Sequence, residues 1–404
     1  MSVARAGRSA RRVLLVAQQL ATVRTGVGTY VRGLALHLSA FGFEVTCLTP
    51  DAGPGPDGAR VVALPRALPL DPTPGGFVSL ALRAARWLRS DAVLAERFDL
   101  VHFTDAREAF LLGERPPFPV VGTVHDDYAL EAPRRVRGLA KVCGDPWRRA
   151  AYYAFLRRVE PAAYARLARL IVNSDHVRRS LSLGYGVPRH RMSVVRIGVE
   201  PPPADLVPAP LAGEPSVLFA GANFYRKGLP TLLAAAASLR PRFPGIRVHV
   251  AGEDRNARRI ARDARAAGIP DGLLVTHGRV APRDLRAMMA AATVFALPSR
   301  TEALGLVLLE AMSVGTPVVA SLSGGSREIV DDGGTGLLVP PGDSAALARA
   351  IERLSLDPGL RREMGARGKA AAAALSPRET AAATAAVYAE VLSGLEPRLA
   401  LARA

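Results

Sequence analysis

Cysteine, lysine and long apolar runs are scarce in this sequence of 404 residues. Its two cysteines, Cys47 and Cys143, belong to no CxxC pair and cannot build a disulfide framework, so we expect a reducing, cytoplasmic setting. No apolar run approaches the roughly 18–20 residues that a membrane span requires. The basic N-terminus precedes an apolar run that soon turns polar. We therefore expect a buried strand there and no signal peptide.

Acidic residues are also few, 36 against 53 basic ones, which gives a net charge of +17. Such a charge points to nucleic acid, an anionic membrane or a phosphate-rich ligand as a partner. Only three basic residues are lysines, Lys141, Lys227 and Lys369, and a coding bias toward arginine would explain part of the excess. The 49% apolar and 22% charged shares are typical of globular proteins, and the length fits two domains.

Short apolar runs alternate with helical periods along the whole chain, which predicts parallel sheets covered by helices on both faces. The predicted strands of the first half are residues 13–17, 44–48, 100–103, 120–124 and 170–172, with a helix over 27–38. Residues 200–215 contain six prolines and predict a semi-rigid linker. Strands then recur at 217–220, 248–251, 273–276, 294–297 and 318–320, with a helix at 229–239.

We therefore predict an α/β protein with two Rossmann-like, doubly wound domains that face each other across a cleft. The first covers residues 1–205 and the second residues 213–377, and a last helix near 378–395 is expected to pack back onto the first. Ligands should bind at the carboxyl ends of the strands.

The tract 299–342 follows directly after a predicted strand. Gly305 is expected to open a helix whose free backbone N–H groups, at Leu304, Gly305 and Leu306, suit a phosphate. Glu302 and Glu310 would repel a phosphate, whereas a carboxylate can accept hydrogen bonds from two sugar hydroxyls at once. Taken singly, either glutamate could instead be a solvated acid near a helix end.

Three further segments lie where the carboxyl ends of strands are expected. Arg226 and Lys227 follow a strand and would clamp a diphosphate, although an exposed pair is the alternative. Gly26 and Gly28 open the first helix, where they allow a close ligand or simply a tight turn. His125 ends a buried strand and would donate to a substrate hydroxyl or move a proton, unless it makes a core hydrogen bond.

Together these motifs resemble the retaining, nucleotide-sugar-dependent glycosyltransferases of family 4, which have the GT-B fold, over nearly the whole chain. The tract E-A-x-G-L-x-x-L-E, from Glu302 to Glu310, carries the resemblance, with the runs AMSVGTPVVAS, G-G-x-x-E-I-V and G-x-G-L-L-V-P-P-G-D after it. The resemblance implies that Glu302 contacts the donor sugar and that Glu310 grips the ribose. It also implies that Arg226 and Lys227 stabilise the departing diphosphate, and that backbone amides of residues 304–306 hold it.

The resemblance further implies a backbone contact between the base and Val280, a closing role for the loop of Gly26 and Gly28, and an active-site role for His125. The chain departs from the family at Ala222, where many members have an arginine. The implied reaction moves a sugar from a nucleoside diphosphate to an acceptor hydroxyl by a same-face, retaining mechanism, in glycan, glycolipid or glycoconjugate biosynthesis. Because the chain has no DxD motif, we expect no metal, and no cofactor besides the sugar nucleotide.

Other functions remain open from the sequence. One is a sugar-nucleotide epimerase of the same fold, and another is a protein that only binds its ligand. Residues 134–191 contain fourteen Lys+Arg against three Asp+Glu, interleaved with Trp147, Tyr152, Tyr153, Phe155 and Tyr164. This segment suits peripheral contact with the anionic inner face of a membrane and a lipid-linked acceptor, or it is a solvated basic face. No nucleic-acid partner is expected, because no recognition module is visible.

Overall fold

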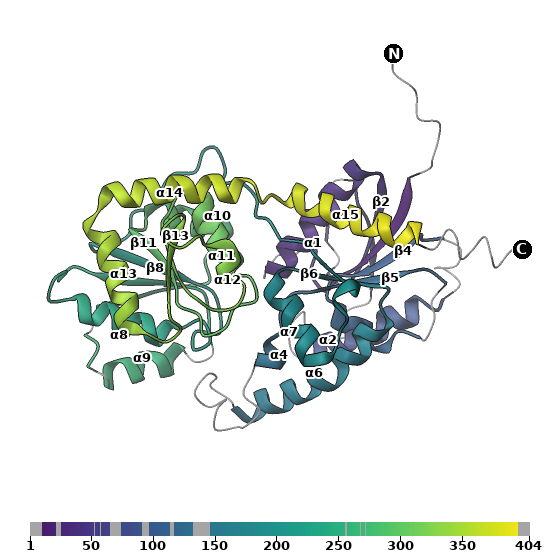
Figure 1. Ribbon diagram of the computed structural model, residues 1–404, viewed down its shortest axis with the longest axis horizontal. Coiled ribbons are helices and arrows are strands. Elements are labelled where there is room, and N and C mark those ends of the chain that lie inside the picture. The colour runs from purple at the N-terminus through teal and green to yellow at the C-terminus, as the bar shows by residue number, and fades with distance from the viewer. Residues whose placement is uncertain are drawn as a thin grey trace, which may run out of the picture.

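The computed structural model describes residues 10–21, 26–51, 53–56, 58–64, 74–90, 97–113, 117–131, 146–254, 257–266, 268–270 and 272–394. Two α/β domains lie side by side, and each is built on a parallel sheet (Figure 1). The doubly wound, two-domain architecture expected from the sequence is confirmed.

The first domain contains a seven-stranded sheet in the order β3-β2-β1-β4-β5-β6-β7. Helices α1 and α15 cover one face, and α2, α6, α7 and the 3₁₀ helix η2 cover the other. The strands are β1 (Arg11–Val16), β2 (Phe43–Thr49), β3 (Arg60–Ala63), β4 (Leu100–Phe103), β5 (Val120–Val124), β6 (Arg169–Val172) and β7 (Met192–Val194). The helices are α1 (Gly26–His37), η1 (Leu38–Phe41), α2 (Pro74–Trp87), η2 (Ala106–Leu111), α4 (Tyr128–Glu131), α6 (Pro146–Arg166), α7 (Asp175–Tyr185) and η3 (Arg189–Arg191).

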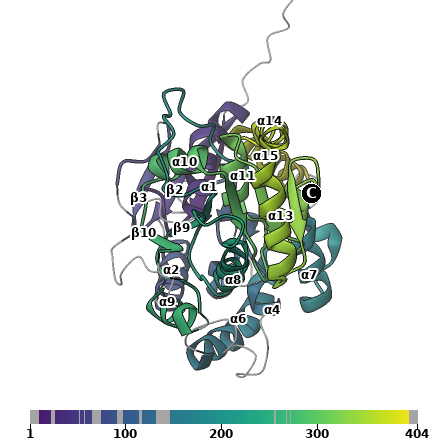
Figure 2. The same cartoon turned by 90° about the vertical axis from the view of Figure 1, so that its left-hand side faces the viewer.

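The second domain contains a six-stranded sheet in the order β10-β9-β8-β11-β12-β13. Helices α8 and α13 pack together on one face, seen from the front in Figure 2, while α10 and α11 lie on the other. The strands are β8 (Ser216–Ala220), β9 (Arg247–Ala251), β10 (Leu274–Gly278), β11 (Val294–Leu297), β12 (Val318–Ser321) and β13 (Gly336–Val339). The helices are α8 (Leu229–Leu239), α9 (Ala257–Ala266), α10 (Pro282–Ala291), α11 (Leu306–Ser313), α12 (Ser326–Ile329), α13 (Ser344–Leu356) and α14 (Pro358–Ala373).

The sequence sets where many of these elements begin and how they are buried. Strands β4, β5, β8, β11 and β12 are buried along their whole length, as apolar strands covered on both faces should be. Among the described residues, four α-helices start at a Ser or Asp whose side chain accepts a backbone N–H, which contributes about 1 kcal/mol each. These residues are Ser174 for α7, Asp343 for α13, Asp357 for α14 and Ser376 for α15.

Helix α15 (Pro377–Ser393) leaves the second domain and lies against α1 and η1 of the first (Figure 1). Its Tyr388 is fully buried and hydrogen-bonds Nδ1 of His102 at 2.6 Å. Nε2 of His102 bonds the hydroxyl of Thr123 at 2.8 Å, which in turn bonds Tyr30 Oη at 2.8 Å. Burial lowers the pKa of His102 to about 3, so the ring is neutral. A buried chain of hydrogen bonds thus joins α15 to β4, β5 and α1.

The chain crosses between the domains twice, once near residue 200 and once near residue 375, and the two crossing segments contact each other. The amide of Val199 donates to the carbonyl of Leu375 at 3.0 Å, and the amide of Gly198 donates to Thr380 Oγ1 at 2.9 Å. A Cβ on Gly198 would lie 2.2 Å from the Leu375 carbonyl oxygen. These residues form the natural pivot between the domains.

The proline-rich segment after this pivot is attached to the second domain along α10. Its contacts are Arg283 to Asp205 at 2.7 Å, Arg286 to the Pro201 carbonyl at 2.9 Å, and the Ala209 amide to the Ala287 carbonyl at 3.0 Å. The proline-rich segment is therefore structurally part of the second domain.

Helix α6 carries all five aromatic residues expected on the basic face of residues 134–191. Trp147 is 72% exposed, but Tyr164 is buried. Tyr152, Tyr153 and Phe155 pack against the cluster of Ala129 and Leu156. Of the five aromatic residues, only Trp147 therefore faces solvent freely. Residues 132–145 lie outside the described residues. In the part of the chain that the structure describes, no helix is long and apolar enough to cross a membrane.

Candidate active site

Two neighbouring strands of the second sheet bring predicted site residues together. Arg226 and Lys227 lie in the turn after β8, and Glu302 lies in the loop after β11, the strand paired with β8. Lys227 Nζ is 3.2 Å from Glu302 Oε2, and Arg226 Nη1 is 3.8 Å from the same oxygen. The sheet order changes direction between β8 and β11, which is where doubly wound sheets bind their ligands.

Two glycines let the loops of this cluster pack closely. Gly228 has φ +80°, and a Cβ there would lie 1.9 Å from the carbonyl oxygen of Pro298. Gly324 has φ +54°, and its Cβ would lie 1.8 Å from the carbonyl oxygen of Glu302, which accepts the amide of Gly325 at 2.7 Å. The glycines of the G-G-x-x-E-I-V run therefore hold the backbone of Glu302 in place.

Glu302 is a buried carboxylate, 5% exposed, surrounded by donors. Its Oε2 accepts from Ser299 Oγ at 3.1 Å as well as from Lys227. Burial by itself raises the pKa of Glu302, but the charges of Lys227 and Arg226 outweigh it and hold that pKa below its usual value. Burial lowers the pKa of Lys227, and the carboxylate of Glu302 opposes this shift. The site thus holds an ionised carboxylate beside two cations.

The start of α11 lies next to this cluster. Gly305 caps the helix at φ +92°, and the backbone N–H groups of Leu304, Gly305 and Leu306 donate to none of the described residues. Unpaired N–H groups at the start of a helix are suited to bind an anion. Farther along α11, burial raises the pKa of Glu310, opposed by Arg286 and Lys227. Its carboxylate forms no hydrogen bond with the part of the chain that the structure describes.

The first domain approaches the start of α11 at the predicted glycine loop. A Cβ on Gly26 would lie 2.9 Å from Cδ1 of Leu306. Gly28 is buried in the first turn of α1, and Thr25 of the same motif lies outside the described residues.

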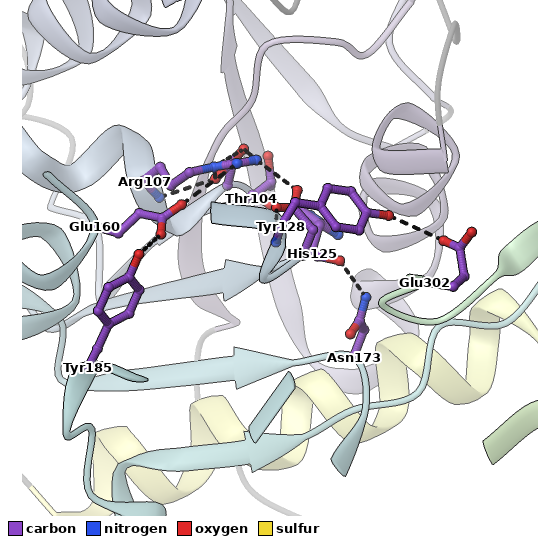
Figure 3. A network of polar contacts seen from close by, with 10 residues as sticks. Thr104, Arg107, His125, Tyr128, Glu160, Asn173, Tyr185 and Glu302 are labelled. Carbon is purple, nitrogen blue, oxygen red and sulfur yellow. Dashed lines mark hydrogen bonds and ion pairs between the residues drawn. The ribbon is translucent and has the colours of Figure 1, made fainter. Parts of the chain in front are cut away.

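His125 follows β5 and is fixed by three neighbours, of which Figure 3 shows Thr104 and Asn173. Nε2 donates to the carbonyl of Thr104 at 2.7 Å, the ring meets Tyr30 edge-on at 5.1 Å, and the His125 carbonyl accepts from Asn173 at 2.8 Å. Burial lowers the pKa of His125, and the nearby charge of Asp105 opposes the shift. A neutral ring that donates through Nε2 keeps Nδ1 as an acceptor for a hydroxyl proton.

Sequence reasoning missed Tyr128, which reaches from the first domain to the second (Figure 3). Its Oη donates to Glu302 Oε1 at 3.2 Å, and Cζ of Arg226 lies 4.0 Å from the centre of its ring. Its position in the run His125-Asp126-Asp127-Tyr128, after a buried strand, was the available signal.

Glu328 and Ser174 were also missed, and they connect the domains at the start of α7. The carboxylate of Glu328 accepts the amides of Asp175 at 3.0 Å and His176 at 2.8 Å. Ser174 Oγ donates to the carbonyl of Ala303 at 2.8 Å. The G-G-x-x-E-I-V run, quoted for the family resemblance, already contained Glu328.

A network around Arg107 lies beside His125 on the first domain (Figure 3). Arg107 pairs with Asp105 at 2.7 Å, Asp126 at 3.3 Å and Glu160 at 3.9 Å. Tyr185 Oη donates to Glu160 at 2.5 Å, and burial raises the pKa of Glu160 to about 7. Carboxylates therefore neutralise this guanidinium.

Val280 is placed apart from the other predicted residues. It follows β10, the edge strand two positions from β8, and packs half-buried against the core. The structure gathers Arg226, Lys227, Glu302 and the α11 start, with Gly26 against that start. Val280 lies at the same edge of the sheet, two strands away from β8.

Comparison with known proteins finds two family models that divide the chain. The model "Glycosyltransferase Family 4" matches residues 24–201, and the model "Glycosyl transferases group 1" matches residues 208–371. The D-inositol 3-phosphate glycosyltransferase of Kineococcus radiotolerans is 33% identical over 403 residues, which cover 90% of each chain.

Two solved structures are similar along almost the whole chain. Sucrose-phosphate synthase from Thermosynechococcus elongatus has a TM-score of 0.75 at 25% identity, covering 95% of this chain and 100% of the other. Anabaena HepE, in complex with UDP and glucose, has a TM-score of 0.69 at 18% identity, covering 94% and 100%.

Proposed function

The chain belongs to glycosyltransferase family 4 and has the GT-B fold, and from this we propose that it moves a sugar from a nucleoside diphosphate to an acceptor hydroxyl with retention of anomeric configuration. One observation carries the proposal. Arg226 and Lys227, both beside the buried Glu302, lie next to three backbone N–H groups that are suited to bind an anion.

Catalysis would rest on stabilising the leaving diphosphate. Negative charge grows on that group as the sugar departs, and preorganised donors lower the barrier most when they are aimed at developing charge. Arg226, Lys227 and the start of α11 supply such donors. Glu302 would meet the sugar, and Glu310, with an unpaired carboxylate within the described chain, would meet the ribose hydroxyls.

Retention would follow a same-face route. A double displacement needs a carboxylate free to attack the anomeric carbon. Both oxygens of Glu302 already accept hydrogen bonds, from Tyr128 on one side and from Lys227 and Ser299 on the other. The neutral His125 would hold a hydroxyl near the reacting centre. Proton NMR of the first product formed should show the donor's anomeric configuration, and the inverted anomer would refute this route.

Metal independence is part of the proposal, because the cation pair and the helix start together can neutralise a diphosphate. Activity should survive EDTA. Loss of activity that added Mg²⁺ restores would contradict it.

The relative is a D-inositol 3-phosphate glycosyltransferase, which makes a phosphorylated inositol a candidate acceptor for this chain. Arg107, the cation beside His125, is held by three carboxylates and offers little to a phosphate. Comparing turnover with inositol phosphate and with inositol tests whether the acceptor must be charged.

Contact with a membrane is a second, separate proposal, supported by Trp147, which is exposed on the arginine-rich helix α6. Tryptophan beside basic residues suits the surface of an anionic bilayer. Flotation with anionic vesicles should exceed flotation with neutral ones, and Trp147→Ala should reduce it. Equal recovery with both vesicles would exclude the contact.

The test of the main proposal begins with thermal shifts against UDP, GDP, ADP and TDP. A nucleotide present at 100 times its Kd adds about 2.7 kcal/mol of stability. Sugars of the nucleotide that binds are then assayed for release of the free nucleotide and for the sugar product. No binding and no turnover with any of them would refute the proposal, and a free sugar epimer as product would indicate an epimerase.

A further inference from the structure

We propose that Tyr128 is a positioning residue that aligns Arg226 toward the leaving diphosphate, and that it does so only while the two domains are in contact. The inference rests on the proposed function. Its basis is one juxtaposition, an aromatic residue of the first domain stacked on the cation of the second.

The position of Tyr128 is fixed by its own loop. It begins the one-turn helix α4 immediately after His125, and its amide donates to Asp126 Oδ1 at 3.4 Å. The amide of Leu130 closes the turn on the carbonyl of Asp127 at 2.8 Å. The ring is therefore attached to the same short segment that carries His125, and any movement of that segment moves both.

Stacking on the face of a guanidinium leaves its in-plane N–H groups available. Cζ of Arg226 lies 4.0 Å from the Tyr128 ring centre, and within the described chain the only hydrogen bond from its side chain is Nη1 to the Thr301 carbonyl at 3.1 Å. A guanidinium carries five N–H donors in one plane, so most of them remain free to meet phosphate oxygens. The ring holds the cation without consuming the groups that would bind the ligand.

The hydroxyl of Tyr128 prevents a competing arrangement. Arg226 Nη1 already lies 3.8 Å from Glu302 Oε2, and a guanidinium prefers to pair with both oxygens of a carboxylate. Tyr128 occupies the second oxygen, Oε1, at 3.2 Å. Without Tyr128, Arg226 would turn into a two-bond pair with Glu302, and its donors would be lost to the diphosphate.

Because ring and cation belong to different domains, the alignment forms only when the domains meet. Separation about the pivot near Gly198 would leave Lys227 and the α11 start with the second domain but would remove the ring from Arg226. Nucleotide binding and turnover should therefore respond differently to the loss of Tyr128. Binding can proceed on the second domain alone, whereas turnover requires the aligned cation.

The test is nucleotide release from the sugar nucleotide that the wild-type protein uses, with water as acceptor, so that the natural acceptor is not needed. Tyr128→Leu should lower kcat at least tenfold and change the Kd of the free nucleotide less than threefold. Tyr128→Phe keeps the ring but loses the hydroxyl that occupies Glu302 Oε1, so its kcat should fall between those of the wild type and Tyr128→Leu. Phe41→Leu removes an aromatic ring under Arg378, a pair of the same kind outside the site, and should leave kcat unchanged.

A double-mutant cycle establishes whether Tyr128 acts through Arg226. In an Arg226→Ala background, Tyr128→Leu should cost less than twofold, because its target is gone. An equal loss in both backgrounds would overturn the inference. Three other results would overturn it as well. They are an unchanged kcat in Tyr128→Leu, a kcat in Tyr128→Phe as low as in Tyr128→Leu, and a nucleotide Kd that rises in Tyr128→Leu as much as kcat falls.

A spectroscopic measurement keeps the inference separate from the proposed function. In the wild-type protein, the Arg226 Nε–H resonance, assigned by its disappearance in Arg226→Lys, should carry a ring-current shift that Tyr128→Leu removes. Absence of that shift overturns the inference whether or not the protein turns over any sugar nucleotide. If the shift is present and no sugar nucleotide is consumed, the proposed function fails, and the alignment of Arg226 for a leaving diphosphate fails with it.

Discussion

Replacing Glu328 by glutamine is expected to loosen the contact between the domains without unfolding either of them. The two carboxylate oxygens accept the amides of Asp175 and His176, at the first turn of the eleven-residue helix α7. Glutamine has nearly the same shape but only one acceptor oxygen, so one amide loses its partner. The change also removes a negative charge from the positive end of the helix dipole.

The magnitude follows from these two losses. A hydrogen bond to a charged group contributes about 1.5–3 kcal/mol, and a charge at a helix terminus about 0.3–1 kcal/mol. The side chain of Glu328 is only 16% exposed, so solvent screens the interaction little. A combined loss of about 2 kcal/mol corresponds to a shift of about 30-fold in the equilibrium between joined and separated domains.

The assay compares kcat/KM for nucleotide release with the radius of gyration from small-angle scattering. Glu328→Gln should lower kcat/KM by about 10- to 30-fold and increase the mean radius of gyration. The control is Glu352→Gln, which breaks the 2.6 Å pair with Arg242 inside the second domain and should change neither quantity.

Two results would refute this reasoning. One is a kcat/KM within twofold of wild type, which would mean that the contact of Glu328 does not limit the reaction. The other is a fall in the unfolding free energy of a single domain as large as the loss in kcat/KM, because Glu328 would then stabilise a fold and not an arrangement.

Three further outcomes are expected. Lys227→Ala should reduce kcat about 100- to 1000-fold. It should also move the acid limb of the pH–rate profile to higher pH, because the cation that lowers the pKa of Glu302 is gone. An acid limb at the wild-type pH would contradict this. Gly228→Ala should destabilise by at least about 2 kcal/mol more than Gly342→Ala in urea unfolding, since both have φ near +80° but only the first would press its Cβ on a backbone carbonyl. Glu160, whose pKa burial raises to about 7, takes up its proton more readily in the folded state, so its stabilising effect is complete below about pH 4.5 and is lost as the pH rises through 7. Glu160→Gln should therefore be more stable than wild type at pH 8, by up to about 3 kcal/mol, with the gain disappearing by pH 4.5; a difference independent of pH would contradict it.

All but one of the strands that could be predicted from the sequence are central, and the exception is the edge strand β10, predicted at 273–276. The runs at 100–103, 120–124 and 294–297 match β4, β5 and β11, because a strand buried on both faces is a continuous apolar run. The strands β3, β7 and β13 were missed, and each lies at the edge of its sheet. An edge strand is short and partly solvated, as the burial of Arg60–Ala63 illustrates, so its sequence resembles a loop.

The part of the candidate site that lies within the second domain could be predicted from the sequence. Loops after neighbouring parallel strands end at the same edge, so the motifs of Lys227 and Glu302 had to meet once the sheet order was known. Tyr128 and Glu328 depend on how two separate domains are placed, and no local periodicity encodes that placement. The aromatic residues of α6 show the same limit, since composition did not reveal that Tyr152, Tyr153 and Phe155 pack inward.

The return of α15 to the first domain sets an order for synthesis on the ribosome. The last strand of the first sheet ends at Val194, but the helix that covers α1 begins only at Pro377. At about 5–20 residues per second, roughly 10–40 s separate the two events. During that interval Phe43 lacks its contact with the Tyr388 ring, whose centre lies 5.3 Å away in the finished protein, and His102 lacks one of its two partners. The domain that is translated first is therefore the last to be completed, and a nascent chain stopped before α15 would expose an apolar patch suited to chaperones.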